Sequence, residues 1–324
     1  MAGMPGYSAG MRRARRPPSP LPQRDGLDAA RIRLPAHGPW ETARDFLVRK
    51  LDRLQPEHID EMLRQGRFVT LDGPIAPDSA YLPNTLVWFH RELPDEVPVP
   101  FEIEVAYADD DIVVADKPHF LATTPRGSHV RQTALVRLRH LLGIRDLAPV
   151  HRLDRVTAGL LLFVTRRELR APYQQLFQNR LVRKEYEAVA PYDPGLELPR
   201  TVRSRIVKKR GVPTAREIPG EPNAETHVDL LDHADGLARY RLLPTTGRTH
   251  QLRVHLASLG VPILGDPLYP EVREIAPDDF TRPLQLLARA LEFDDPVTGE
   301  RRRFESKREL VAWSDHAAWL SGPA

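Results

Sequence analysis

Cysteine is absent from the chain of 324 residues. Disulfide bonds, thiolate nucleophiles, cysteine-type zinc sites and iron–sulfur clusters are therefore excluded. This absence suits a reducing cytosol, and we expect a cytoplasmic location. Long apolar runs are also missing, because no stretch approaches the roughly 18 residues that predict a membrane-spanning helix. We therefore expect the chain to be soluble.

The sequence also lacks the motifs of several common enzyme sites. It contains no GxxxxGK[ST] phosphate loop, no GxGxxG after a strand and no HExxH helix. We therefore expect neither a nucleotide cofactor nor a metal ion. Any chemistry then depends on carboxylates, histidines, arginines and tyrosines.

Acidic residues are missing from the first 24 residues, which contain five arginines. Because the whole chain carries a net charge of +3, residues 25–324 carry −2, and the overall charge is a poor guide to partners. Positive charge gathers at residues 166–184 and at residues 203–216, which include Lys208, Lys209 and Arg210. Both stretches suit contact with nucleic-acid phosphates, and both equally fit ordinary solvated faces.

Large apolar residues are scarce over residues 1–38, which are rich in arginine and proline and are predicted to form a flexible basic tail. From Trp40 the apolar spacing predicts two short helices, and GRFVTLDG then predicts a strand entering a turn. In this order of elements, residues 39–95 resemble a degenerate S4-like RNA-binding module. Prolines at residues 94–100 predict a linker into the next domain.

Residues 101–324 are predicted to form the second domain, with a mixed α+β fold in which strands dominate. FEIEVAY and DIVVADKP flank a turn and predict a hairpin. Helices are expected near residues 169–177 and 250–259. Further strands are expected at GLLLFVT, KEYEAVA, ETHVDLLDH and LARYRLL. Strands and helices do not alternate regularly, which argues against a doubly wound parallel sheet.

The densest polar cluster is VHRLDRVTAGLLLFVT, in which Asp154 lies between Arg152 and Arg155 just before an apolar strand. Asp154 is therefore expected in a loop at the edge of a sheet. A carboxylate held between arginines has its ionised form favoured and is ready to act as a nucleophile. A structural ion pair in a loop explains these residues at least as well, and the cluster alone does not decide.

A second cluster, TTGRTHQLRVHLASLG, predicts a helix capped by Thr249 and ended by Gly260 in the left-handed conformation. Arg253 falls at the edge of the apolar face of this helix. A buried arginine needs an acidic partner, and Asp154 is the natural candidate.

Histidine and tyrosine complete the set of candidate residues. His250 and His255 lie about 140° apart on a helix, so packing or hydrogen bonding suits them better than metal binding. In RKEYEAVA, strand alternation places Lys184 and Tyr186 on one face. Tyr186 is suited to stacking on a base, and a core tyrosine fits the pattern equally well.

Taken in order, HRLDRVTAG, RKEYEA and TGRTHQLRVHLASLGVPILGDPLY resemble the RluA-type pseudouridine synthases, and DIVVADKP resembles the segment that opens their catalytic domain. The resemblance covers about residues 101–304. It implies a long mixed, mostly antiparallel sheet with flanking helices, in two halves with the active-site cleft between them. It also implies an isomerase that converts uridine to pseudouridine in structured RNA, extrudes the target base and needs no cofactor.

The resemblance also implies roles for individual residues. Asp154 matches the catalytic aspartate of the family, Tyr186 its active-site tyrosine and Arg253 the basic residue that pairs with the aspartate. Arg152 matches a residue that fills the space a flipped nucleotide leaves in the RNA. Two positions depart from the usual pattern, Ala158 in place of serine and Phe120 in place of glycine, and the segment LARALEFDDP lacks its usual histidines.

Other interpretations remain at this point. A noncatalytic RNA-binding protein on the same fold is one, although all three active-site residue types are present. A glycosidase is another, but it needs a second placed carboxylate, and Asp266 is interpreted as a structural residue in a Gly-Asp-Pro turn. We expect the substrate to be 23S ribosomal RNA, because family members acting there often carry an S4-like module, and tRNA is the alternative. We also expect the protein to be a monomer.

Overall fold

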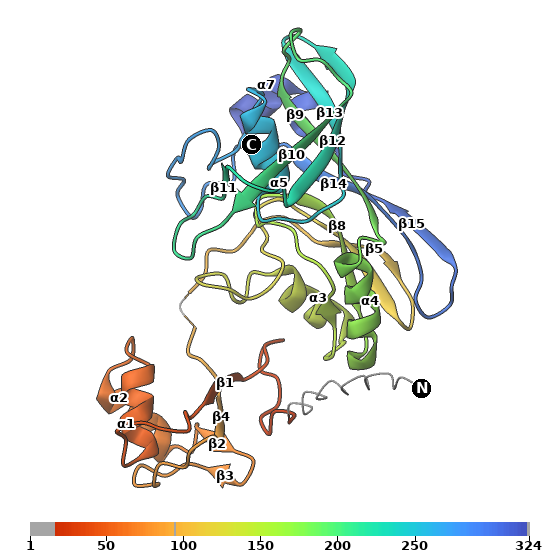
Figure 1. The fold of residues 1–324 in the computed structure, drawn as a ribbon. Helices are drawn as coiled ribbons and strands as arrows, with labels where there is room; N and C mark the ends of the chain where they lie inside the picture. The colour runs from red at the N-terminus through yellow and green to blue at the C-terminus, as the bar shows by residue number, and fades with distance from the viewer. Residues whose placement is uncertain (1–16, 94, 323–324) are drawn as a thin grey trace, which may run out of the picture. The chain divides into compact units, whose positions relative to one another are not determined.

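The structure is a computed structural model that describes residues 17–93 and 95–322 (Figure 1). The chain forms two compact units, Met1–Leu93 and Pro94–Ala324, and each is described by itself. The division between them falls at the start of the proline-rich stretch. No helix in the described part of the chain is long and apolar enough to cross a membrane.

The first unit packs two helices against a small sheet with the strand order β1-β4-β2-β3. Thr42 begins α1 with a reciprocal cap, in which its hydroxyl accepts from the backbone N–H of Asp45 and the Asp45 carboxylate accepts from the backbone N–H of Thr42. Phe46 and Leu47 of α1 are buried in the core of this unit. The elements are β1 (Ala30–Arg33), α1 (Ala43–Lys50), α2 (Pro56–Arg64), β2 (Val69–Thr70), β3 (Gly73–Pro74) and β4 (Leu86–Phe89).

The predicted tail is shorter than the 38 residues that its composition suggests. Residues 30–33 form β1, which pairs antiparallel with β4, and Leu34 is buried. Ile32 and Leu34 alternate with Arg31 and Arg33, which is the period of a half-buried strand. An average composition over 38 residues hides this alternation, so the boundary at residue 38 is wrong. Residues 1–16 of the predicted tail lie outside the described residues.

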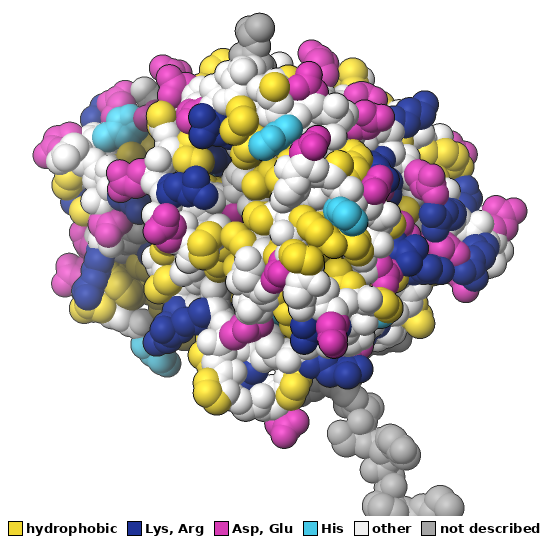
Figure 2. All heavy atoms as spheres, turned by 90° about the horizontal axis from the view of Figure 1, so that it is seen from above, with side chains coloured by type: hydrophobic (Ala, Val, Ile, Leu, Met, Phe, Trp, Pro, Cys, Tyr) yellow, Lys and Arg dark blue, Asp and Glu magenta, His cyan; other side chains and the backbone are white. Residues whose placement is uncertain are grey.

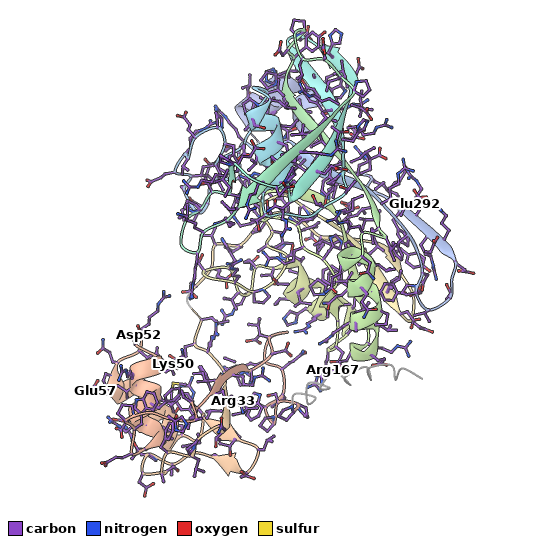
Figure 3. All side chains as sticks on the ribbon, in the orientation of Figure 1. Arg33, Lys50, Asp52, Glu57, Arg167 and Glu292 are labelled. Atoms are coloured by element: carbon purple, nitrogen blue, oxygen red, sulfur yellow. The ribbon has the colours of Figure 1, made fainter. Side chains whose placement is uncertain are left out.

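The two predicted helices and the strand pair that follows them are confirmed. Figure 3 shows Lys50 and Asp52 at the end of α1 and Glu57 on α2, so acidic and basic side chains occur together on these helices. Arg44 of α1 forms an ion pair with Asp60 of α2. The likeness to an S4 module stays a prediction.

The second unit is built on one sheet of eleven strands in the order β11-β10-β12-β13-β9-β14-β8-β6-β5, with β15 on β14 and β7 on β8. Among the described strand pairs only β14 and β8 run parallel. The strands are β5 (Glu104–Ala108), β6 (Ile112–Lys117), β7 (Ala148–Pro149), β8 (Ala158–Val164), β9 (Arg183–Pro191), β10 (Arg200–Val207), β11 (Arg216–Ile218), β12 (Ala224–Ala234), β13 (Leu237–Pro244), β14 (Leu286–Asp294) and β15 (Arg301–Glu305). The helices are α3 (Ala134–Leu142), η1 (Arg167–Leu169), α4 (Arg170–Gln178), α5 (Gln251–Ser258), α6 (Val311–Ser314) and α7 (His316–Ser321).

Figure 1 shows the two halves of this sheet, which meet where β14 pairs with β8. Helix α5 lies beside the half that contains β9, β13, β12 and β10. Helices α3 and α4 lie beside the half that contains β8 and β5. The large mixed, mostly antiparallel sheet with flanking helices that the sequence predicts is therefore confirmed. The expected hairpin of β5 and β6 is confirmed as well.

The central strands β6 and β8 are buried along their whole lengths, which explains why β8 is a continuous apolar run and why β6 is apolar up to its last two residues, Asp116 and Lys117. Val113 of β6 faces one core together with Leu138 of α3. Val114, the next residue along, faces the other core together with Tyr173 of α4. Because alternate side chains point to opposite faces, one strand contributes to both cores and is held rigidly between them.

Gly159 allows the two halves to meet. It pairs with Ala288 of β14 with φ +107°, a backbone conformation that L side chains rarely adopt. A Cβ atom at this position would lie 2.3 Å from the carbonyl oxygen of Ala288. Glycine is therefore required for the close approach of β8 to β14, five residues after Asp154.

We predict that Gly159→Ala lowers the free energy of unfolding by about 2–5 kcal/mol, because it combines backbone strain with a steric clash. The matched control is Gly236→Ala, since Gly236 also has a positive φ (77°) but open space around its Cβ position. We expect this control to lose only about 1–2 kcal/mol. Denaturant unfolding of the three proteins makes the measurement, and equal losses in both variants would contradict the role given to Gly159.

Candidate active site

A cleft of about 1010 Å³ in the second unit brings together the candidate residues from distant parts of the sequence. Asp154, Arg152, Tyr186 and Arg253 all line it. Among the described residues of the lining, Asp154 is the one acidic side chain. The basic side chains of the lining are Arg126, Arg152, Arg180, Lys184, Lys208, Lys209, Arg210, Arg248 and Arg253. The cleft is therefore strongly electropositive, and its single carboxylate is placed within that positive field.

The charge of the cleft is a local feature. Figure 2 shows one face of the molecule, on which lysine and arginine side chains are interspersed with aspartate and glutamate. The net charge of the whole chain is only +3. Both basic stretches of the sequence contribute to the lining of the cleft. Residues 166–184 contribute Arg180 and Lys184, and residues 203–216 contribute Lys208, Lys209 and Arg210.

The loop that carries Asp154 is held by two buried polar side chains, one at the end of β6 and one in the segment after it. The Thr123 hydroxyl donates to the carbonyl of Leu153 at 2.8 Å. The Lys117 ammonium donates to the carbonyl of Arg155 at 3.2 Å, one residue beyond Asp154. Burial lowers the pKa of Lys117 well below its usual range, and carbonyl oxygens of Pro118 and Leu121 also accept from it. These bonds fix the backbone on both sides of the carboxylate.

Arg253 joins Asp154 to a second carboxylate. Its Nε and Nη2 donate to the two oxygens of Asp266 at 2.8 and 2.6 Å, and its Nη1 lies 3.4 Å from Oδ2 of Asp154. The sequence predicts Asp154 as the acidic partner of Arg253, and this is only partly right. The main partner is Asp266, because a guanidinium buried to 2% exposure is stabilised best by a bidentate carboxylate that is itself fully buried.

Asp266 is the structural residue that the Gly-Asp-Pro turn predicts, with a wider role than a turn. Its Oδ1 also accepts from the backbone N–H groups of Leu268 and Tyr269. Burial by itself would lower the pKa of Arg253. The hydrogen bond and the negative charge of Asp266, together with the smaller effect of the Asp154 charge, outweigh burial and raise this pKa. Arg253 therefore stays protonated and presents Nη1 to Asp154 in the cleft.

Tyr186 and Lys184 project from β9 into the cleft, as strand alternation predicts. Burial, together with the negative charge of Asp154, raises the pKa of Tyr186, so its phenol stays neutral. Lys184 donates to the carbonyl of Thr246 at 2.9 Å. Burial, reinforced by the charge of Arg180, lowers the pKa of Lys184 to about 8.

Arg152 and His151 have different positions although they are adjacent. Arg152 is exposed and lines the cleft, which leaves its guanidinium accessible to a ligand. The His151 ring stacks on Phe177 at 4.5 Å, and its Nε2 accepts from the backbone N–H of Leu162. Burial lowers the pKa of His151 to about 3, so it is a neutral structural residue.

The start of α5 differs from the prediction. Thr249 is exposed, and the N-cap is His250, which has a left-handed backbone and no side-chain capping bond. Gln251 instead holds the loop before the helix, because its side-chain oxygen accepts from the backbone N–H of Arg248 and from the hydroxyl of Thr246. Gly260 does take the expected left-handed conformation at the other end.

The two histidines of α5 form hydrogen bonds, as expected. His255 contacts the hydroxyls of Thr226 and Ser204, and His250 contacts the hydroxyl of Tyr269. Within residues 17–93 and 95–322, no group of three or more histidine, aspartate or glutamate side chains is arranged to hold a metal ion.

Sequence reasoning did not identify how Lys117, Thr123 and Asp266 hold the site in place, because all three are far from Asp154 in the sequence. The family-like DIVVADKP segment contains Lys117, and the Gly-Asp-Pro turn indicated a structural role for Asp266 but not its ion pair with Arg253. Phe120, which stands where the family pattern has glycine, adopts φ 64° and is buried against Phe101 and Phe280. The backbone there keeps the conformation that suits glycine, and apolar packing stabilises it.

Comparison with known proteins places this geometry in a family. Residues 111–258 match the family described as RNA pseudouridylate synthase. The chain is 31% identical over 269 residues to the ribosomal large subunit pseudouridine synthase D of Vibrio vulnificus, a match that covers 76% of this chain and 81% of the relative. It is 29% identical over 304 residues to the protein of that name from Pseudomonas aeruginosa, covering 85% and 92% of the two chains.

The chain belongs to the RluA-type pseudouridine synthase family. It is therefore an isomerase that acts on RNA, which confirms the enzymatic interpretation over a noncatalytic RNA-binding protein or a glycosidase. Human pseudouridylate synthase RPUSD2 is 31% identical over 227 residues, covering 68% of this chain and 41% of the human protein. The solved structure of human RNA pseudouridylate synthase domain containing 1 shares the fold of this synthase, with a TM-score of 0.54 at 23% identity over 66% of this chain and 87% of that chain.

We predict that Asp266→Ala lowers the free energy of unfolding of this synthase by about 3–5 kcal/mol, because it leaves the buried guanidinium of Arg253 unpaired. Asp266→Asn keeps one acceptor and is expected to lose less. The rate of pseudouridine formation should fall in both variants as Arg253 loses its orientation. The control is Asp146→Ala, which removes a largely exposed carboxylate 3.6 Å from Arg170 and is expected to lose below about 0.5 kcal/mol. Wild-type stability in Asp266→Ala would contradict this account.

Proposed function

We propose that this pseudouridine synthase isomerises uridine in large-subunit ribosomal RNA, with Asp154 as its catalytic carboxylate. The observation that carries the proposal is the position of Asp154 as the single acidic side chain, among described residues, in a cleft lined by basic ones. A polyanion is attracted to such a cleft as a whole. A carboxylate in such a cleft repels the RNA phosphates, so its presence there is best explained by a role in the chemical reaction.

The reaction explains why an ionised carboxylate is needed. Isomerisation breaks the bond between N1 of uracil and C1′ of ribose, turns the base and joins C5 to C1′. Asp154 either adds to C1′ or takes a proton from the sugar, and both routes require the charged, fixed form of the side chain. Arg253 at 3.4 Å from Asp154 Oδ2 supports that form, and the buried Asp266 supports Arg253.

Two further residues are proposed to receive the RNA. The target base has to leave its helical stack at a cost of a few kcal/mol, and Tyr186 offers an aromatic face beside the carboxylate for it. Arg152 is exposed at the cleft and is proposed to occupy the space that the extruded nucleotide leaves. A neutral phenol at Tyr186 suits stacking without repelling the RNA phosphates.

The choice of ribosomal RNA rests on the relatives. The proteins from Vibrio vulnificus and Pseudomonas aeruginosa carry ribosomal large subunit in their names. The similarity to the second of these extends over 85% of this chain, beyond the matched family region. We propose 23S ribosomal RNA on this basis, and tRNA is the alternative that site mapping separates from it.

Three further predictions from the sequence stay proposals. The first unit is proposed to be a degenerate S4-like module that contacts RNA, supported by its order of two helices followed by short strands. A cytoplasmic location is supported by the absence of cysteine. The third proposal is that the protein acts as a monomer.

We predict that Asp154→Asn abolishes pseudouridine formation while thermal stability and RNA affinity stay close to wild type. Pseudouridine is mapped in total RNA from cells that lack the gene and from the same cells supplied with wild-type, Asp154→Asn or Asp146→Asn protein. We expect specific positions of 23S ribosomal RNA to lose the modification and to regain it with wild type and Asp146→Asn only. Loss confined to tRNA would overturn the proposed substrate, and full rescue by Asp154→Asn would overturn the proposed catalytic role.

The lowered pKa of Lys184 predicts a pH dependence of RNA binding. Lys184 is protonated below its pKa of about 8 and loses its positive charge as the pH rises through that value. We expect the RNA affinity of the Asp154→Asn protein to fall roughly tenfold between about pH 7 and about pH 9, the cost of one charged contact. Lys184→Arg stays charged and should flatten this dependence, and an unchanged slope in that variant would assign it to other groups. Filter binding over the pH range provides the measurement.

A further inference from the structure

His250 is the N-cap residue of α5 and lies at the N-terminal end of this helix. Its backbone is left-handed, with φ 59°, a conformation that few residues other than glycine adopt. Its side chain is 11% exposed and lines the cleft next to Asp154. Strained residues of this kind cluster at functional sites, where the surrounding structure holds them. The contacts of the His250 ring therefore need an explanation.

The hydrogen bonds of Tyr269 determine which nitrogen of His250 carries a proton. The Tyr269 hydroxyl accepts from the backbone N–H of Ala215 at 2.7 Å and lies 2.9 Å from the carbonyl oxygen of Ala215. It also lies 2.9 Å from Nδ1 of His250. The phenol has one proton, and the carbonyl can only accept it. All three bonds form together only when Nδ1 of His250 donates its own proton to the Tyr269 oxygen.

Nε2 of His250 is consequently the free, basic nitrogen of the neutral ring. It lies 3.9 Å from Oδ2 of Asp154, too far for a hydrogen bond between them. Burial lowers the pKa of His250, partly opposed by the charge of Asp154 and reinforced by that of Arg253, with smaller contributions from Asp266 and Lys208. The ring is therefore neutral near pH 7, and its lone pair points toward the place where a substrate would contact Asp154.

We propose that His250 is the base that removes the C5 proton of the uracil in the last chemical step, an inference that rests on the proposed role of Asp154. After C5 has bonded to C1′, it still carries its hydrogen. Nε2 takes this proton, and the electron pair of the C–H bond restores the C5–C6 double bond of the ring. The proton then passes from Nε2 to N1, which needs one when its bond to C1′ has been lost. No outside group is consumed.

The geometry places C5 within reach of His250. Asp154 acts at the sugar, on C1′ or on its neighbour, and C5 is bonded to C1′ when the proton leaves. An atom next to C1′ thus lies close to Asp154 Oδ2, and Nε2 is only 3.9 Å from that oxygen. A single reacting atom can therefore contact both side chains at ordinary van der Waals distances.

Other groups of the cleft are less suited to accept this proton. Tyr186 is kept neutral by its raised pKa, so its phenolate is not available. Nε2 of His151 already accepts from Leu162, and the Lys184 amine donates to Thr246. Within the described lining, His250 is the base whose lone pair is left without a donor and faces Asp154.

The test compares wild type with His250→Asn on full-length 23S ribosomal RNA transcribed with either ordinary or 5-deuterated uridine. Asparagine tolerates the left-handed backbone, and its amide N–H can replace Nδ1 as donor to Tyr269, but it has no counterpart of Nε2. We expect single-turnover pseudouridine formation to slow by about 100-fold or more. We also expect the slowed reaction to show a primary isotope effect at C5, because proton removal then limits the rate.

A structural role for His250 would give a different result. A slowed reaction with no isotope effect at C5, or a rate close to wild type, overturns the proposal. His250→Ala provides a second measurement, in which added imidazole is expected to restore part of the rate, and absence of rescue counts against the proposal. Tyr269→Phe removes the bond that orients the ring and should slow the reaction less than His250→Asn. Asp154→Asn abolishes product from both RNAs if the proposed function holds, so failure of that function is seen separately.

Discussion

The guanidinium of Arg253 is fixed between two carboxylates, and the proposed active site is arranged around it. A charge buried to this degree is tolerated only with a well-placed counter-charge, which Asp266 supplies through two hydrogen bonds. The Nη1 group is left to face Asp154, whose Oδ2 lies 3.4 Å away. Because Asp266 lies in the loop after α5 and Asp154 precedes β8, this chain of charges also ties together the two halves of the sheet.

The backbone around Asp154 depends on the close meeting of those halves. β8 runs parallel to β14 at Ala158 and Gly159, and only a residue without a Cβ atom fits against Ala288 there. The loop before β8 is held in addition by Lys117 and Thr123, which come from the end of β6 and the segment after it. The carboxylate is therefore positioned by a rigid, doubly covered sheet, which suits a reaction that requires accurate placement of the sugar.

Electrostatics act here over two ranges. The basic lining of the cleft is suited to attract a polyanion, although the chain as a whole is nearly neutral in net charge. Close to Asp154, burial keeps Tyr186 and His250 neutral. The basic side chains that line the cleft suit binding of RNA phosphates. The neutral side chains of Tyr186 and His250 beside the carboxylate suit binding of an uncharged base.

The sequence by itself determined part of the secondary structure, the α+β class and the three motifs that identify the family. In the second unit it predicted the strands β5, β6, β8, β9, β12 and β13 and the helices α4 and α5. These features follow from local periodicity and from residues close together in the chain, as at β6, α5 and HRLD. Only the tertiary structure decided that Asp266 is the main partner of Arg253, that β1 belongs to the first unit and that His250 faces Asp154. Such contacts join residues separated by 13 to 96 positions, from Arg253 and Asp266 to Asp154 and His250 (250 − 154 = 96), and they arise from burial and hydrogen bonding that no local pattern encodes.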